Sequence, residues 1–415
     1  MKWKTIKENK FARNVITLAS GTIISQGVLI LALPLLTRLY SPEQFSDFSL
    51  FNSVLLLVGT IACFRMDIAL PIAKEEKDAD NVLILGLLFS FLVFILVLII
   101  CTLLISKDIL SFNFIFLPFS IFFFGIFNLA QMSSTRDKKF KEISKARVLQ
   151  NVTGSFIQVL LGFFSWSVNF GLMLGQSFVF IFGGGYLLLR SSFVNRIKKR
   201  KEFNIRGTFL KYKDYITYST LEAALNSAST QLPVIIIALY YDELAGFILI
   251  AMKVMQIPLK LLGNSIGQVY LSEAPEHYNK GTIDSFATKV LKRLLYVGVL
   301  PISIIGLLSP FLFGIAFGSE WMESGEIALW MTPWFILQFL TSPLAMSFHI
   351  TNNQKQAFYI QLLGFFLRNF SVFICVYYQI NYVVEVFALS SAVFYFVYLY
   401  LCMRCVGVKG FYIKC

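Results

Sequence analysis

Two long apolar runs joined by a short polar turn constrain this chain more than any other feature. Within residues 19–71 the runs read ASGTIISQGVLILALPLLTRLY and FSDFSLFNSVLLLVGTIACFRMDIALP, and SPEQ lies between them. Each run has about 20 residues, which is enough for an α-helix to cross the apolar core of a bilayer at about 1.5 Å per residue. The short turn predicts that the two helices form an antiparallel pair.

A similar pair of runs returns in residues 219–275. The two segments share a proline in the first run, a glutamate in the turn and a proline after the second run. The matched pairs are Pro34 with Pro233, Glu43 with Glu243, and Pro71 with Pro275. These matches predict that one six-helix unit occurs twice in the chain.

The composition indicates an all-α integral membrane protein. Of the 415 residues, 57% are hydrophobic and 14% are charged, whereas a soluble domain carries about 25% charged residues. Long apolar runs separated by polar loops predict twelve membrane-spanning helices. The expected spans are 14–36, 45–66, 81–105, 113–134, 147–165, 168–189, 215–239, 244–270, 290–312, 326–348, 357–378 and 382–404.

The basic residues are distributed very unevenly among the loops between these spans. If the chain starts inside, 31 of the 36 Lys and Arg lie in inner segments, and only Arg38 and Lys107 lie in outer loops. Because cytoplasmic loops are enriched in Lys and Arg, both termini are predicted to be cytoplasmic. The net charge of +13 therefore indicates orientation and contact with membrane lipids, not nucleic-acid binding.

A long polar connector, residues 190–214, separates two predicted lobes, residues 1–205 and 206–415. Each lobe has six expected helices, so both lobes start on the same side of the membrane and the repeat is parallel. A transport site is then expected between the lobes.

Three basic residues fall near the middle of expected helices, all in the second lobe: Lys253, Lys260 and Arg368. A charge at that depth costs at least about 2.5–3.5 kcal/mol on insertion, so it usually faces a cavity or a partner. Lys253, Gln256 and Lys260 recur at intervals of three or four residues and therefore share one helix face.

Two more polar faces lie in the same lobe. Gln361 shares a face with Arg368 in the span 357–378, and Glu222 shares one with Asn226 in the span 215–239. Three polar faces in one lobe predict a wet, positively charged cavity wall. In the first lobe, Arg147 begins the span 147–165 and is expected at the cytoplasmic mouth.

Each of these residues also has a purely structural interpretation. Lys260 lies toward the cytoplasmic half of its helix, from which its ammonium group can reach the lipid headgroups, whereas Arg368 is too central to do so. Glu222 is either a structural partner of Lys260 or Arg368, or a carboxylate that couples transport to a proton or sodium ion. The amide side chains on the three faces are alternatively contacts between helices.

An acidic segment follows the second expected helix and is predicted to be a solvated cytoplasmic loop. It contains Asp67, Glu75, Glu76, Asp78 and Asp80. Its spacing matches no metal site, and the two histidines of the chain, His277 and His349, lie in unrelated loops. We expect neither a metal nor a cofactor.

Three stretches near the start of the chain carry a family resemblance. TLASGTIISQG, the turn TRLYSPEQFSDFSLF and the loop RMDIALPIAKEEKDA resemble the Wzx-type O-antigen flippases. These polysaccharide flippases belong to the multidrug/oligosaccharidyl-lipid/polysaccharide exporter superfamily. The resemblance implies a MATE-like fold of two six-helix lobes.

The resemblance further implies a transporter and not an enzyme. Its expected substrate is a polyprenyl-pyrophosphate-linked oligosaccharide, an O-antigen or capsule repeat unit, moved by alternating access to the outer leaflet of the bacterial inner membrane. On this interpretation Lys253, Lys260, Arg368 and Arg147 bind the pyrophosphate or the sugar. The other implied partners are membrane lipids, a coupling ion (H⁺ or Na⁺) and other polysaccharide assembly proteins.

Two rival classes stay open at this point. A drug or cation antiporter of the same superfamily would be expected to use buried acids, whereas the mid-depth charges here are mostly basic. A polysaccharide polymerase or ligase would be expected to have a large outer loop with catalytic Arg or His, whereas the outer loops here are short. A lipid II flippase of the superfamily would be expected to have about fourteen helices instead of twelve.

Overall fold

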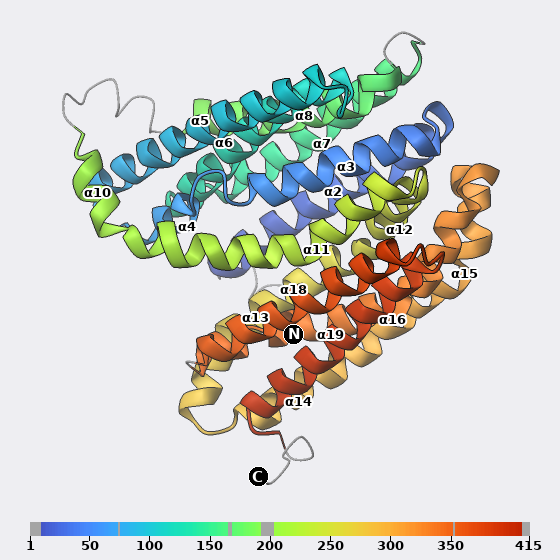
Figure 1. Ribbon diagram of the computed structural model, residues 1–415. Coiled ribbons are helices and arrows are strands. Elements are labelled where there is room, and N and C mark those ends of the chain that lie inside the picture. Colours follow the sequence, from blue (N-terminus) through green and yellow to red (C-terminus); the bar gives the residue numbers. More distant parts are fainter. Residues whose placement is uncertain (1–9, 74, 165–167, 192–202, 352, 409–415) are drawn as a thin grey trace. The chain divides into compact units, whose positions relative to one another are not determined.

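The computed structural model describes residues 10–73, 75–164, 168–191, 203–351 and 353–408 (Figure 1). Every regular element in these residues is a helix. The chain forms two compact units. Unit 1 comprises Met1–Ser41 and Phe51–Ser227, and unit 2 comprises Pro42–Leu50 and Ala228–Cys415. The division into lobes 1–205 and 206–415 stays a prediction, and residues 192–202 of the connector that suggested it lie outside the described residues.

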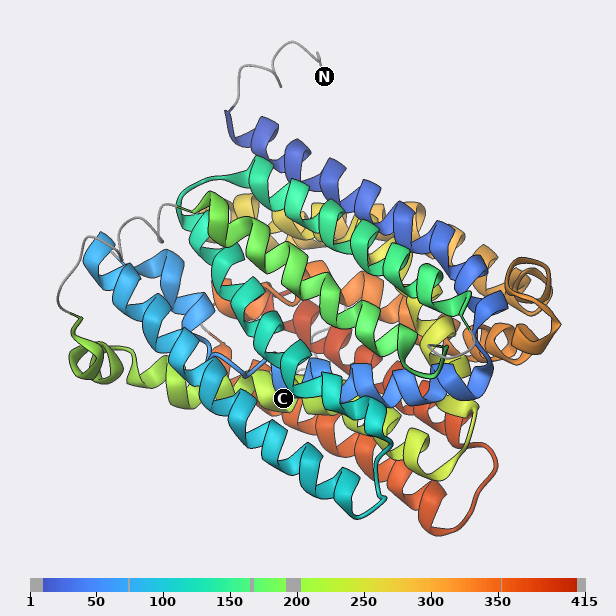
Figure 2. The same cartoon turned by 90° about the horizontal axis from the view of Figure 1, so that it is seen from above.

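Unit 1 is built from long helices that pack side by side. In the order of their contacts these helices are α2, α7, α8, α6 and α5, as Figure 2 also shows. The bounds are α2 Lys10–Leu39, α3 Pro42–Gly59, α4 Met66–Ala69, α5 Glu76–Ser106, α6 Phe116–Arg136, α7 Phe140–Gly162, α8 Val168–Arg190, α10 Ile205–Lys211 and α11 Thr220–Tyr240. Helices α3 and α11 each contribute residues to both units.

Unit 2 is organised around α16. This helix packs against α12, α15 and α19, and α18 packs against α19. Trp321, at the start of α16, is 1% exposed, and Trp334 in α16 is 2% exposed. The bounds are α12 Leu244–Pro258, α13 Asn264–Asn279, α14 Ile283–Leu294, α15 Leu300–Phe317, α16 Met322–Leu344, α17 Ser347–Ile350, α18 Gln354–Tyr377 and α19 Val383–Cys405.

Two expected spans of unit 2 are longer in the structure than the sequence predicts. Helix α12 continues through a π-helical segment, Leu259–Gly263, into α13, and α14 continues through a second one, Leu295–Val299, into α15. Single π-helical turns inside α-helices are often found at functional sites. Lys260 lies in the first of these segments.

Ten of the described helical segments are long and apolar enough to cross a membrane. They coincide with ten of the twelve predicted spans. At the other two positions, 45–66 and 147–165, the chain is helical in α3 and α7, but polar residues lower the mean hydropathy of these helices. The structure therefore supports a multi-pass helical membrane protein, with ten spans identified where twelve were predicted.

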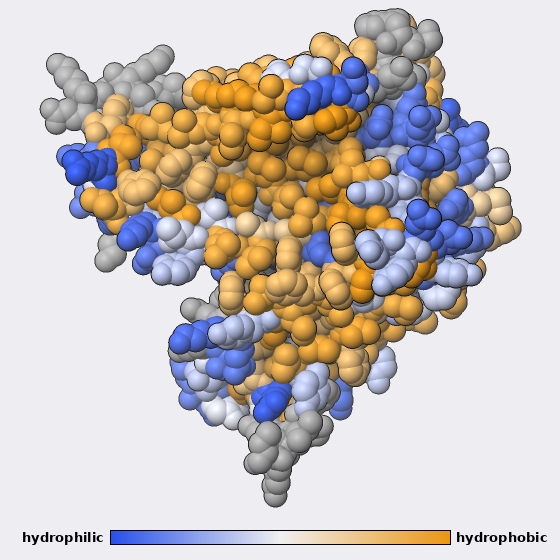
Figure 3. Space-filling model, viewed as in Figure 1, coloured by the Kyte–Doolittle hydropathy of each residue, from blue (hydrophilic) through white to orange (hydrophobic). Residues whose placement is uncertain are grey.

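Exposed apolar side chains cover the outer surface of unit 1. On α5 they include Leu88, Phe91, Leu92, Ile95, Leu96, Ile99 and Leu103. Figure 3 shows the apolar surface over α5 and α6. A contiguous apolar surface of this kind marks a membrane interaction site in a folded protein, which is the role that the composition predicts.

The acidic segment is not the solvated loop predicted from the sequence. Asp67 is 5% exposed and Asp80 is 4% exposed. Glu76 begins α5, so the acidic residues after it lie in the first turns of that helix, where negative charge is stabilised by the helix dipole. The sequence pattern could not distinguish a charged loop from a charged helix start.

The short helix α10 is anchored to unit 1 by hydrogen bonds to α5. The Tyr212 hydroxyl donates to Asp78 Oδ2 at 2.8 Å, and the Lys211 ammonium pairs with the same oxygen. Tyr212 is 6% exposed and belongs to the cluster of buried apolar residues around Met66 and Leu83. Burial and the Asp78 carboxylate raise the pKa of Tyr212, so its hydroxyl stays a donor.

We expect Tyr212→Phe to destabilise the chain more than Lys211→Gln. A buried hydrogen bond to a charged acceptor contributes about 1.5–3 kcal/mol, whereas an exposed ion pair contributes about 0–1 kcal/mol. The measurement is the thermal unfolding midpoint of each variant in one detergent. An equal or larger loss in Lys211→Gln would show that the buried bond does not anchor α10.

Candidate functional site

Arg368 is the most deeply buried charge on the predicted site helices. It lies in the middle of α18 and is 2% exposed. Its Nη1 donates a hydrogen bond to Ser229 Oγ of α11 at 3.1 Å. Its Cζ atom lies 4.3 Å from the ring centre of Phe394 and 5.1 Å from that of Tyr395. We call Arg368 with these rings and Trp334, at 6.0 Å, the arginine cage.

The arginine cage leaves two of the guanidinium nitrogens unsatisfied. Nε and Nη2 of Arg368 are buried and have no hydrogen-bond partner among the described residues, and the same holds for Trp334 Nε1. The rings offer cation–π attraction, which is worth about 0.5–2 kcal/mol. A buried charge without an ion-pair partner nevertheless costs several kcal/mol, so the site favours an added acceptor with negative charge.

A glycine one turn before Arg368 makes room for the closest ring. A Cβ atom at Gly364 would lie 2.5 Å from Cε2 of Phe394, which is too close for any side chain. The absence of a side chain at Gly364 therefore allows Phe394 of α19 to pack over the guanidinium group from the neighbouring helix.

We expect Gly364→Ala to displace Phe394 and to destabilise unit 2 by about 1–3 kcal/mol, the usual cost of overpacking. The matched control is Gly267→Ala in α13, where the nearest atom, Pro343 Cα, would lie at an ordinary 3.8 Å. Thermal unfolding of both variants tests this. If the two midpoints fall equally, the close packing of α18 and α19 at Gly364 does not make a side chain there more costly to stability than elsewhere.

Lys253 projects from α12 over an aromatic ring of the α3 segment that belongs to unit 2. Its Nζ atom lies 5.0 Å from the ring centre of Phe48, which is 1% exposed. Lys253 itself is half-buried and has no carboxylate partner among the described residues. Phe48 is held in a cluster in which Phe45 packs edge-on against Trp321 at 4.9 Å.

The remaining predicted site residues of unit 2 make no polar contact within the described residues. Lys260, Gln256 and Gln361 are all half-buried, and their side chains make no hydrogen bond or ion pair within the described residues. Lys253 and Arg368 contact different rings, so these two cations occupy separate surroundings.

In unit 1, Arg147 joins three helices. Its Nε and Nη2 donate to Gln131 Oε1 of α6 at 3.4 and 3.3 Å, and its Nη1 donates to Thr22 Oγ1 of α2 at 3.1 Å. Its backbone carbonyl accepts a hydrogen bond from Ser25 at 3.0 Å. Arg147 is half-buried. All these partners are neutral, so the arginine keeps an uncompensated charge while it fixes α7 against α2.

Glu222 and Asn226 lie on α11 in the part that belongs to unit 1. Both are exposed. Glu222 has no ion-pair partner within the described residues of unit 1. The two roles predicted for Glu222, a structural partner or an ion-coupling carboxylate, stay predictions.

Sequence reasoning missed the aromatic residues of the arginine cage. Trp334 lies on α16, and Phe394 and Tyr395 lie on α19. The chain has 44 Phe, 18 Tyr and 5 Trp, so aromatic identity alone does not single out three of them. Gly364, at helical spacing before Arg368, was the one local signal of a close helix contact.

Comparisons with known proteins show which family and which fold this chain is similar to. A sequence model described as Polysaccharide biosynthesis protein matches residues 35–326. The solved structure of the lipid II flippase MurJ, inward closed, has a TM-score of 0.75 and 16% identity and covers 94% of this chain and 87% of its own. An inward-facing multidrug resistance MATE transporter of the MOP superfamily has a TM-score of 0.65 and 12% identity, covering 93% and 94%. No curated protein matches. The fold is therefore MATE/MurJ-like.

Proposed function

Because the chain belongs to the polysaccharide biosynthesis protein family over residues 35–326, we propose that it flips a lipid-linked oligosaccharide across the membrane. The family and the MATE/MurJ-like fold support a polysaccharide-biosynthesis transporter of the MOP superfamily. The prediction that the chain is not an enzyme is confirmed. The proposed substrate is a polyprenyl-pyrophosphate-linked O-antigen or capsule repeat unit.

The observation that carries this proposal is the set of unpaired cations in unit 2. Lys253, Lys260 and Arg368 have no ion-pair partner among the described residues, and Arg368 leaves two buried N–H groups unsatisfied. Arg and Lys form strong charge-assisted hydrogen bonds with phosphate. A pyrophosphate carries enough negative charge to offset such cations, whereas a cationic drug would add to the repulsion.

The helix contacts support the proposed internal repeat. In unit 1, α7 packs on α8, α8 on α6 and α6 on α5; in unit 2, α18 packs on α19, α19 on α16 and α16 on α15. These are the fifth, sixth, fourth and third expected helices of each half, in the same order. This correspondence, with α3 and α7 taken as spans, favours twelve helices in two parallel six-helix repeats.

The proposal also covers the membrane, the orientation and the partners of the transporter. It lies in the bacterial inner membrane with both termini cytoplasmic, exchanges substrate with other polysaccharide assembly proteins, and alternates between inward and outward access. Arg147 and the amides of Asn226, Gln256 and Gln361 contact the sugar or stabilise the helices. Glu222 is the candidate for coupling to H⁺ or Na⁺. A solved structure of similar fold is named a lipid II flippase, and this name supports the proposal that a lipid is flipped here.

The experiment is complementation of bacteria that lack their own O-antigen flippase, in strains that each supply a different repeat unit. We expect wild type to restore surface polysaccharide in at least one strain and Lys253→Gln to restore much less. The matched control is Lys355→Gln, which removes an exposed charge at the start of α18. Rescue by Lys253→Gln at the wild-type level would show that Lys253 does not bind the substrate. If wild type restores surface polysaccharide in none of the strains, the proposed substrate class is contradicted.

A further inference from the structure

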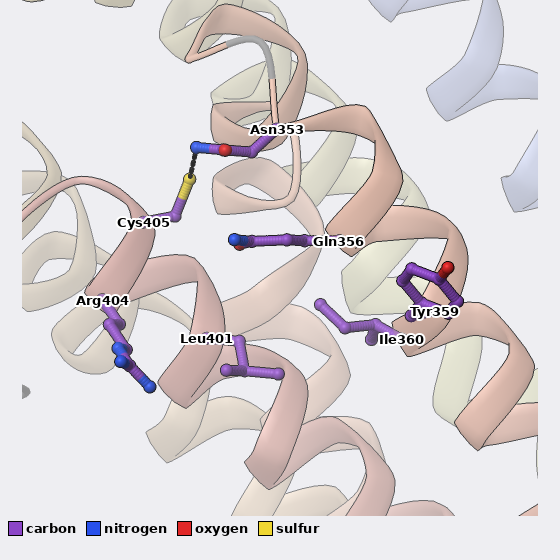
Figure 4. Close-up of a pocket in the computed structure, with 7 residues that line it drawn as sticks. All are labelled: Asn353, Gln356, Tyr359, Ile360, Leu401, Arg404 and Cys405. Carbon is purple, nitrogen blue, oxygen red and sulfur yellow. Dashed lines mark hydrogen bonds between the residues drawn. The ribbon is translucent and has the colours of Figure 1, made fainter. Parts of the chain in front are cut away.

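A pocket of about 470 Å³ lies between the start of α18 and the end of α19. These two helix termini are on the side of the membrane that is predicted to be cytoplasmic. Figure 4 shows the pocket with Gln356 projecting into it from α18 and Arg404 facing it from α19. Tyr359, Ile360 and Leu401 form its less polar side, and Asn353 and Cys405 close one end.

The closed end of the pocket is held in place by hydrogen bonds. Asn353 Nδ2 donates to Thr351 Oγ1 at 3.0 Å and to Cys405 Sγ at 3.3 Å, so the turn before α18 is tied to the end of α19 (Figure 4). Thr351 Oγ1 donates in turn to the Ser347 carbonyl at 2.9 Å. These hydrogen bonds therefore hold one end of the pocket in place without a ligand.

Two polar side chains that face the pocket, those of Arg404 and Gln356, are available to a ligand. Arg404 and Gln356 are both exposed, and their side chains have no hydrogen-bond or ion-pair partner among the residues that the structure describes. Helix α18 starts at this pocket, with Asn353 as its N-cap, and the positive end of its dipole points the same way. A guanidinium, an amide donor and a helix start together suit a phosphate group.

Two apolar stripes end at the same pocket. Along α18 the exposed side chains Tyr359, Leu363, Phe366, Phe370, Phe373 and Tyr377 recur every three or four residues. Along α19 the exposed Leu389, Val393 and Phe396 lie on the face that ends at Arg404. Apolar side chains exposed in this pattern face acyl chains, so the pocket lies where a lipid has its headgroup.

We propose that this pocket binds the phosphate group of an anionic membrane phospholipid, with the acyl chains along the stripes of α18 and α19. The site is separate from the arginine cage, because Gln356 and Arg368 are about 18 Å apart along α18 at 1.5 Å per residue. The lipid would hold α18 against α19 at the membrane surface, and this role does not depend on the identity of the transported sugar.

The test is native mass spectrometry of the full chain in detergent, titrated with phosphatidylglycerol, with diacylglycerol of the same chains, or with inorganic phosphate alone. We expect phosphatidylglycerol to bind at least about tenfold more tightly than diacylglycerol, because a charge-assisted hydrogen bond to phosphate is lost with the headgroup. Inorganic phosphate at the same concentration should displace little lipid, because it lacks the apolar contacts.

The variants separate this site from general surface charge. Arg404→Gln should remove the tenfold preference, Gln356→Leu should weaken it about two- to threefold, and Lys355→Gln, a charge removed outside the pocket, should leave it unchanged. The proposal is overturned if Arg404→Gln binds phosphatidylglycerol like wild type, or if Lys355→Gln loses as much preference as Arg404→Gln. It is also overturned if inorganic phosphate displaces the lipid fully, because the pocket would then be a free-anion site.

Discussion

Arg368→Gln is expected to abolish transport while leaving the protein as stable as wild type, or more stable. Arg368 is 2% exposed, and its Nε and Nη2 atoms have no partner among the described residues. Removing a buried charge relieves a desolvation cost of several kcal/mol. The change also removes one hydrogen bond, worth about 1.5–3 kcal/mol, and the cation–π attraction of the rings, worth about 0.5–2 kcal/mol. We expect the relieved desolvation cost to offset these losses, so that the proposed role of Arg368 in transport, and not stability, accounts for its charge.

The transport loss should be on the order of a hundredfold, because a charged hydrogen bond and the buried cation together stabilise bound phosphate by about 3 kcal/mol. Arg368→Lys should recover only part of it, since an ammonium cannot present the planar fork that pairs with phosphate oxygens. Thermal unfolding and transport are measured on the same preparations. Lys289→Gln, on the exposed face of α14, is the matched control for the removal of one positive charge.

The alternative is that Arg368 only holds helices together through Ser229 and the aromatic rings. In that case Arg368→Gln would lower the unfolding midpoint, and transport would fall only in proportion to the amount of folded protein. Wild-type transport by Arg368→Gln would exclude a substrate role for the arginine cage entirely.

Gly246→Ala is expected to destabilise unit 2 strongly, because the added methyl group would meet backbone atoms of α3. Gly246 lies near the start of α12, where a Cβ atom would meet the Pro42 carbonyl oxygen and would lie 2.9 Å from the Ser46 backbone nitrogen. Both obstacles are backbone atoms, which cannot move aside as a side-chain end can. The clash would force the start of α3 away from α12 and would disturb Phe45 and Phe48, which pack next to Lys253 and Trp321.

The expected cost of Gly246→Ala is at least about 1–3 kcal/mol, the usual range for overpacking. The matched control is Gly185→Ala in α8, where a Cβ atom meets nothing within 4 Å. That change should be neutral or stabilising by up to about 1 kcal/mol, because alanine favours a helix over glycine. The unfolding midpoints of the two variants are measured side by side. The midpoint of Gly246→Ala should fall below the wild-type value, and that of Gly185→Ala should equal or exceed it. A Gly246→Ala midpoint at or above the wild-type value would show that α3 and α12 do not pack this closely.

The sequence predicted the fold well where one simple physical property decides it. Long apolar runs identify membrane helices, and ten of the predicted spans match helices that satisfy length and hydropathy alone. The runs at α3 and α7 contain Glu43, Asp47 and Arg147, so their helical state depends on packing against neighbours more than on hydropathy. The predicted span 244–270 already ran through Leu259–Gly263, but the apolar pattern marked neither the π-helical form of that segment nor the continuation of α13 to Asn279.

The candidate site was predicted less completely, because helical spacing gives a face but not its neighbours. The spacing placed Arg368 in the middle of a helix, and the structure has it there, 2% exposed. It could not show that Phe394 and Tyr395 of another helix cover the guanidinium group, which depends on how α18 meets α19 at Gly364. The burial of Asp67 and Asp80 was missed for the same reason: a local run of acids does not reveal the helices that pack over it.

The most direct test of the proposed function is flipping by the purified protein in vesicles. The vesicles carry a fluorescent polyprenyl-pyrophosphate oligosaccharide, and a membrane-impermeant quencher reports how much of it changes leaflet. We predict that wild type moves the labelled lipid at least about tenfold faster than empty vesicles and that Arg368→Gln at equal protein density does not exceed the empty-vesicle rate. Two results would contradict a flippase with a cationic site at Arg368. One is that wild type and Arg368→Gln move the labelled lipid at the same rate. The other is that wild type moves none of the repeat units tested.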